Sequence, residues 1–166
     1  MSPHATQPFN ILIVDDEPIN IQLLGSVLRE FDYEIQFATS GKEALDWVNS
    51  ESFDLVLLDV MMPAMNGYEV CKRIKKNRAI NAIPILFLSA SVSAGKRIKG
   101  FEIGAVDFIT KPFNRVELLA KVKTHLELKR SREKLVSQKN ELDEALKEIE
   151  RLKSLNIEHR TSNIEW

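Results

Sequence analysis

The sequence has a single cysteine, no long apolar run and no excess of charge of either sign. With Cys71 alone, the 166 residues can form neither an internal disulfide nor a zinc site with several thiolates. No stretch reaches the roughly 18 consecutive apolar residues of a membrane-spanning helix, and residues 1–9 have neither the basic start nor the apolar segment of a secretion signal. The 23 basic and 24 acidic side chains nearly balance, unlike the basic excess typical of proteins that bind nucleic acid. These absences favour a cytoplasmic protein that binds neither nucleic acid nor membranes directly.

Short apolar runs alternate with amphipathic segments over the first two thirds of the chain. The runs are Ile11–Val14, Ile35–Ala38, Leu55–Leu58, Ile85–Leu88 and Val106–Ile109. The first, third and fourth are apolar throughout, which is typical of strands buried on both faces of a parallel sheet. The second has polar residues at alternate positions, Glu34 and Gln36, and is predicted to be an edge strand. The pattern predicts an α/β fold in which helices connect five parallel strands through right-handed crossovers.

Local signals mark where the helices begin. Pro18 suits the first turn of one helix. Ser40 and Asn66 are predicted to be the N-caps of the next two, because their side-chain oxygens can accept hydrogen bonds from backbone amides of the first turn. A fourth, shorter helix carries Ile98 and Phe101. Cys71 falls on the apolar stripe of the third helix and is expected to be buried.

The last third of the chain has a different character. From Asn114 onward it contains no glycine or proline, and the pattern predicts a continuous helix as far as Asn156. Four aliphatic residues recur every seven positions: Leu128, Leu135, Leu142 and Ile149. The residues three positions after them form a mixed row of Ser131, Gln138, Ala145 and Leu152. This heptad pattern predicts a coiled-coil seam with one strong and one weak row.

Polar side chains of complementary types follow the predicted strands. They are Asp15 and Asp16 after the first strand, Asp59 after the third, Ser89 after the fourth and Lys111 after the fifth. Ligands of open α/β sheets bind at the carboxyl ends of the strands, so we expect these groups to share one edge of the sheet. Clustered carboxylates favour a hard cation such as Mg²⁺, and a carboxylate can accept a phosphoryl group. Taken singly, Asp15 or Asp16 could instead cap the first helix.

Several motifs, in this order, resemble one known family. They are Ile11–Pro18 (ILIVDDEP), Leu55–Pro63 (LVLLDVMMP) with Asn66-Gly67, Leu88–Ala90 (LSA), and Gly104–Phe113 (GAVDFITKPF). Together they are similar to the receiver domain of bacterial two-component response regulators. The resemblance covers residues 8–128 and implies a flavodoxin-like sheet with strand order 2-1-3-4-5. Residues 129–156 would then form a coiled-coil helix continuing the last receiver helix, and residues 157–166 a tail.

The resemblance also implies a role for each matching residue. Asp59 would accept the phosphoryl group. Asp16, Asp59 and the backbone carbonyl of Met61 would bind Mg²⁺, with Asp15 acting through a metal-bound water. Lys111 and Ser89 would contact the phosphoryl group, with Ser89 also taking part in switching. Phe108 would be the switch aromatic, and the Lys111–Pro112 bond would be cis.

Two functions remain open at this level. The chain is expected to take its phosphoryl group from a histidine kinase or phosphotransfer protein and to pass the signal on through a homodimer formed by its C-terminal helix. Alternatively, it is the N-terminal regulatory part of a longer regulator whose output domain is a cyclase, phosphatase or kinase. No catalytic set other than the self-catalysed phosphoryl transfer and autodephosphorylation of a receiver is visible in the sequence.

Overall fold

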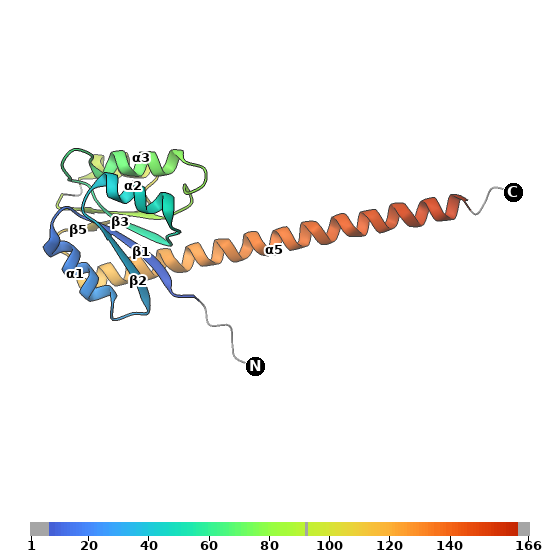
Figure 1. The fold of residues 1–166 in the computed structure, drawn as a ribbon, viewed down its shortest axis with the longest axis horizontal. Helices are drawn as coiled ribbons and strands as arrows, with labels where there is room; N and C mark the ends of the chain where they lie inside the picture. Colours follow the sequence, from blue (N-terminus) through green and yellow to red (C-terminus); the bar gives the residue numbers. More distant parts are fainter. Residues whose placement is uncertain (1–6, 92, 163–166) are drawn as a thin grey trace. The chain divides into compact units, whose positions relative to one another are not determined.

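A parallel sheet forms the centre of the fold. The computed structural model describes residues 7–91 and 93–162, and within them five strands form one sheet in the order β2-β1-β3-β4-β5 (Figure 1). The strands are β1 (Phe9–Val14), β2 (Tyr33–Ala38), β3 (Leu55–Asp59), β4 (Ile85–Ser89) and β5 (Asp107–Thr110). The helices are α1 (Pro18–Leu28), α2 (Gly41–Ser50), α3 (Gly67–Lys76), α4 (Ala94–Glu102) and α5 (Arg115–Ser162). The predicted α/β fold and its strand order are confirmed.

Alternate residues of the strands pack into two separate apolar layers. Because successive side chains of a strand point to opposite faces, Leu12 and Val14 pack into one cluster while Ile11 and Ile13 pack into the other. The first cluster also takes buried side chains from α2 and α3, and the second takes them from α1 and from the first turns of α5. The sheet is therefore covered on both faces, which explains why its central strands are apolar throughout.

The edge strand and the helix caps follow the sequence signals. β2 lies at the edge of the sheet, as predicted. The Ser40 hydroxyl accepts a hydrogen bond from the Glu43 amide at 3.2 Å, and the Asn66 side chain accepts one from the Glu69 amide at 3.0 Å, so both N-caps are confirmed. β2 begins two residues earlier than its apolar run, because Tyr33 pairs with Phe9 of β1.

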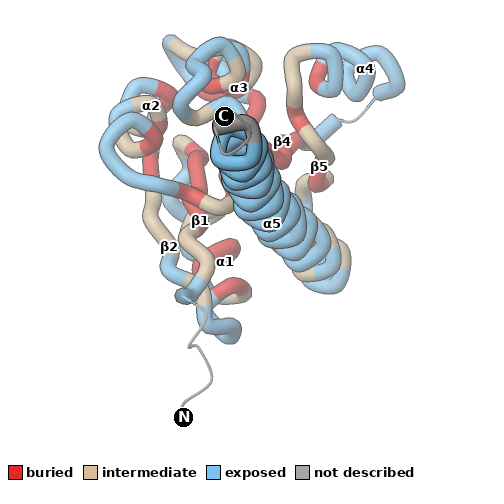
Figure 2. Tube along the Cα trace, turned by 90° about the vertical axis from the view of Figure 1, so that its right-hand side faces the viewer, coloured by how far each residue is buried: buried red, intermediate tan, exposed pale blue. Residues whose placement is uncertain are grey.

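The C-terminal helix extends through a second compact unit. Contacts between Cα atoms divide the chain into one unit ending at Glu127 and another beginning at Leu128, and α5 is helical in both. In the second unit the four aliphatic residues of the heptad row are between 46 and 64% exposed, and Figure 2 shows this part of α5 in pale blue. Within the described residues, no helix combines the length and apolar character needed to cross a membrane.

Candidate functional site

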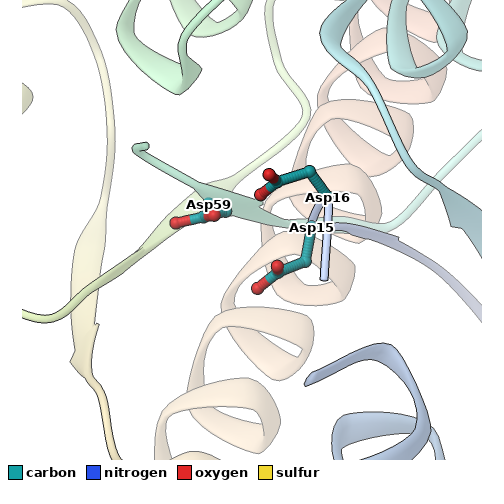
Figure 3. Close-up of side chains that lie close together, drawn as sticks. All are labelled: Asp15, Asp16 and Asp59. Carbon is teal, nitrogen blue, oxygen red and sulfur yellow. The ribbon is translucent and has the colours of Figure 1, made fainter. Parts of the chain in front are cut away.

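The strand ends bring three carboxylates together. Asp15 and Asp16 follow β1, and Asp59 is the last residue of β3, the neighbouring strand in the sheet. One oxygen from each of these side chains lies within 4.8 Å of the others (Figure 3). Asp15 and Asp59 are buried, and Asp16 is partly exposed. Three carboxylates this close repel one another unless a cation compensates their charge.

Lys111 supplies one such charge from the end of β5. Its ammonium group donates a hydrogen bond to Asp15 Oδ2 at 2.8 Å and lies 3.2 Å from Asp59 Oδ1. Burial acts to lower the pKa of Lys111, but the hydrogen bond and charge of Asp15, together with Asp59, outweigh it and raise the pKa. Lys111 therefore stays protonated at neutral pH and bridges two of the three carboxylates. The peptide bond between Lys111 and Pro112 is cis.

Asp15 has hydrogen-bond partners at both carboxylate oxygens. Oδ2 accepts from Lys111, while Oδ1 accepts from the Glu17 amide at 3.0 Å and from the Asn20 side chain at 3.2 Å. The residue at the N-cap of α1 is Glu17, not Asp15 or Asp16. The capping alternative for these two residues is therefore wrong, because the helix begins later at Pro18. Asn20, which sequence reasoning did not single out, helps to hold Asp15 in place.

The Asp59 carboxyl group is buried, and only one of its two oxygens has a hydrogen-bond partner among the described residues. Burial raises the pKa of its carboxyl group above the usual value and the charge of Asp15 adds to the rise, while Lys111 and the Met61 amide oppose it. Oδ1 accepts the Met61 amide at 3.2 Å. Within the described part of the chain, no hydrogen bond falls on Asp59 Oδ2. One oxygen is thus anchored, and the other is available as a nucleophile or ligand.

Ser89, Phe108 and Met61 complete the set of predicted site residues. The Ser89 hydroxyl, at the end of β4, donates to the Ser91 carbonyl at 2.8 Å in the loop that follows. The Phe108 ring is 2% exposed and packs against Phe87 and Phe101, with ring centroids 5.5 and 5.4 Å away. Met61 is 75% exposed beside the carboxylates. Among the described residues, no hydrogen bond joins Ser89 to Phe108, and none joins either residue to Asp59.

Gly67 is a structural requirement of the site that the sequence motif contains but does not explain. A Cβ atom at this position would lie 2.2 Å from the backbone oxygen of Asp59 and 2.9 Å from the Cα of Val60. The Gly67 amide also donates to the Val60 carbonyl at 2.9 Å. The first turn of α3 can therefore approach the end of β3 only because residue 67 lacks a side chain.

We expect Gly67→Ala to destabilise the fold by about 1–3 kcal/mol, the usual cost of overpacking a site where backbone must move. Unfolding in urea measures this change in the free energy of unfolding. Gly95→Ala in α4 is the matched control, because nothing lies within 4 Å of a Cβ there. It should stabilise the protein slightly, since alanine is the better helix former. Equal unfolding midpoints for Gly67→Ala and the unchanged protein would show that the close approach does not constrain the site.

Comparison with known proteins places this arrangement in a family. Residues 11–123 match the model of the response regulator receiver domain. A protein from Vibrio cholerae described as a probable cyclic di-GMP phosphodiesterase is 42% identical over 143 residues, which cover 86% of this chain and 32% of that protein. The response regulator PleD of Caulobacter vibrioides is 41% identical over 114 residues, which cover 69% of this chain and 25% of PleD. The chain thus spans a third or less of the length of these relatives.

Solved structures agree with this assignment. The chemotaxis response regulator CheY4 of Vibrio cholerae has 32% sequence identity and a TM-score of 0.68, covering 71% of this chain and 98% of CheY4. The receiver domain of the Francisella response regulator 1452 has 30% identity and a TM-score of 0.67, with coverage of 71% and 96%. The family model matches more than half of the chain. The strand order and the carboxylate cluster of this chain are those expected of the family. The chain belongs to the response regulator receiver domain family.

Proposed function

We propose that the protein accepts a phosphoryl group on Asp59 from the phosphohistidine of a histidine kinase or phosphotransfer protein. The observation that carries the proposal is the position of Asp59 at the end of β3, beside Lys111 and two further carboxylates. Membership of the receiver family supports such a donor.

Each group has a part in the transfer. Asp59 Oδ2 attacks the phosphorus, and the bond from phosphorus to the donor imidazole nitrogen breaks as the new phosphorus–oxygen bond forms. Lys111 neutralises charge on the phosphoryl oxygens as they approach, and Ser89 donates a hydrogen bond to one of them after turning from Ser91. The donor histidine keeps the electron pair and takes a proton from solvent.

The carboxylates fit Mg²⁺ because all three offer oxygen ligands within reach of one another. We assign Asp16, Asp59 and the Met61 carbonyl as direct ligands and Asp15 as a ligand through water. Both Asp15 oxygens have protein partners, whereas no described hydrogen bond engages the Asp16 carboxylate. When bound, Mg²⁺ would supply positive charge opposite the phosphoryl oxygens.

Magnesium affinity should therefore depend more on Asp16 than on Asp15. We expect Asp16→Asn to weaken Mg²⁺ binding at least about 10-fold, because the loss of an outer-shell partner alone costs about 10–100-fold in metal affinity, and we expect Asp15→Asn to weaken it less. Isothermal titration calorimetry with Mg²⁺ measures both, and Asp46→Asn on the exposed side of α2 is the control with the same charge change. The reverse order would overturn the ligand assignment.

Phosphorylation itself tests the proposed function. Treatment with acetyl phosphate and Mg²⁺ should add the mass of one phosphoryl group to the intact protein, and EDTA should prevent the addition. No adduct with either acetyl phosphate or a phosphorylated donor domain would argue against a phosphoacceptor role.

We further propose that the chain acts as a homodimer through a coiled coil of residues 129–156, following a receiver unit of residues 8–128. The exposed aliphatic row of α5 supports this arrangement, because four large side chains at heptad spacing otherwise face water. Dimerisation would convert phosphorylation of the receiver into a change in the pairing of the helix. Residues 163–166 of the predicted tail lie outside the described residues.

A second candidate function rests on the lengths of the relatives. The match to the Vibrio cholerae protein extends over 86% of this chain but only 32% of that protein, so most of that protein lies outside the matched region. In this alternative the helix links the receiver to an enzymatic output domain. Immunoblotting of the native host with an antibody against the receiver separates the two: a band far above 19.0 kDa supports the alternative, and a band at that mass excludes it.

A further inference from the structure

The charges of the receiver unit are separated along the sequence. Residues 70–101 contain eight lysines and arginines and no aspartate or glutamate. The other residues between 7 and 127 contain six basic and sixteen acidic side chains. A unit that is slightly acidic as a whole therefore has one strongly basic segment.

Seven of these eight cations lie on two neighbouring helices, α3 and α4. The Lys99 ammonium of α4 lies 4.7 Å from the ring centre of Tyr68 in α3, so the two helices are neighbours. Five exposed cations make up what we call the basic face: Lys72, Lys76, Lys96, Arg97 and Lys99. Arg73 is excluded, because its guanidinium pairs with Glu69 of the same helix at 2.9 Å. Lys75 does not belong to it, because its ammonium group donates to the carbonyls of Asn81 and Ile83.

Fold stability does not explain the basic residues at the start of α4. In α3, Lys76 stands in the last turn, where it suits the helix dipole. In α4, however, Lys96 and Arg97 lie in and beside the first turn, which contains no acidic residue and where the dipole disfavours positive charge. Only Gly100 of this helix is buried, and Figure 2 shows most of α4 in pale blue. These cations therefore weaken the helix that carries them, which indicates a role outside folding.

Apolar side chains interrupt the basic face. Ile98 stands between Arg97 and Lys99 and is 58% exposed. Phe101, one turn on, is 48% exposed and packs in a T-shaped arrangement against the ring of Phe108. A nucleic acid would meet this face with its phosphate backbone, which has no apolar surface against which Ile98 could be buried. The centre of a protein interface, by contrast, is apolar, and its rim is polar.

We propose that the basic face of α3 and α4 docks a partner protein whose contact surface is acidic around an apolar centre. Ile98 and Phe101 would be buried in the middle of the contact. The surrounding lysines and Arg97 would set the partner and its orientation, because charge complementarity contributes more to specificity and association rate than to raw affinity. The proposal is independent of phosphorylation at Asp59.

A fluorescently labelled helical peptide with leucines along one stripe and glutamates beside it serves as the probe. Its fluorescence anisotropy is measured with the full chain at 0.15 M salt. Lys72→Glu with Lys96→Glu should weaken binding about 10-fold or more, as expected when charge pairs become repulsive. Lys42→Glu with Lys123→Glu is the matched control, because both lysines are exposed outside the basic face and the net charge changes equally. It should alter binding less than about twofold.

Further measurements distinguish a protein partner from nucleic acid and from a membrane surface. Ile98→Ser should weaken binding of the peptide about threefold or more, because an exposed apolar anchor is lost. No change in this variant, or equal losses in the two double variants, would overturn the proposal. Tighter binding of a labelled 20-base-pair duplex than of the peptide would assign the face to nucleic acid instead. Cosedimentation of most of the protein with vesicles of phosphatidylglycerol and phosphatidylcholine would assign it to a membrane surface.

Discussion

Asp59→Ala is expected to abolish the phosphoryl adduct formed with acetyl phosphate and Mg²⁺. The nucleophile disappears, and the neighbouring Asp15 is not free to replace it. Asp15 is buried with both oxygens engaged by Lys111, Glu17 and Asn20. The expected result by intact-mass spectrometry is complete loss of the added mass.

The fold should survive this change. The pKa of Asp59 is raised because burial and the charge of Asp15 disfavour its ionised form, so removing the carboxylate relieves unfavourable interactions. Lys111 keeps Asp15 as a partner at 2.8 Å. Asp32→Ala, at an exposed position after α1, is the control and should be phosphorylated like the unchanged protein. An undiminished adduct in Asp59→Ala would show that the acceptor is another residue.

The second large effect concerns the helix after residue 127. Changing Leu135 and Leu142 together to Lys is expected to give monomers by light scattering, whether or not the receiver is phosphorylated. Two charges per chain would enter the strong row of the seam, where coiled coils require apolar side chains. Polar residues in the second row, Ser131 and Gln138, already limit its affinity.

We expect the pairing to be parallel. In that register Glu127 faces Arg132 of the second copy and Glu148 faces Lys153, although Lys134 opposes Lys139. Exposed pairs of this kind contribute only about 0–1 kcal/mol each, so they choose orientation while the aliphatic row supplies the affinity.

A matched variant tests whether the seam matters rather than charge alone. Val136→Lys with Ile157→Lys adds the same two charges at exposed aliphatic positions outside both rows. This variant should remain dimeric. If the Leu135 and Leu142 variant is dimeric too, the receivers hold the dimer and the helix is not its main contact.

The α/β fold and the location of the site were accessible from the sequence because the relevant signals are local, whereas the strand order was implied only by the resemblance to the receiver family. Apolar runs mark buried parallel strands, and a polar residue directly after such a run must lie at the carboxyl edge of the sheet. Asp15, Asp59 and Lys111 follow this rule, and the structure brings them within hydrogen-bond or ion-pair distance. The N-caps Ser40 and Asn66 were equally local, since each bonds an amide three residues on.

Features that depend on contacts between distant segments were not accessible. Nothing near Asn20 indicates that its amide holds Asp15, because that contact requires the bend between β1 and α1. The need for glycine at position 67 arises from the backbone of Asp59, eight residues earlier. The rotamer of Ser89, which turns toward Ser91, depends on its loop and could not be read from residue type.

The two apolar layers divided by the sheet have a consequence for how the molecule can deform. Leu57 belongs to the layer beneath α1 and α5, and Leu58, the next residue, to the layer beneath α2 and α3. Phe108 lies in the second layer only. Because the layers share no side chain, cavities made in them should have nearly additive costs. A substitution around Phe108 should therefore cost contacts in the layer beneath α2 and α3 alone, and should leave the packing beneath α1 and α5 unchanged.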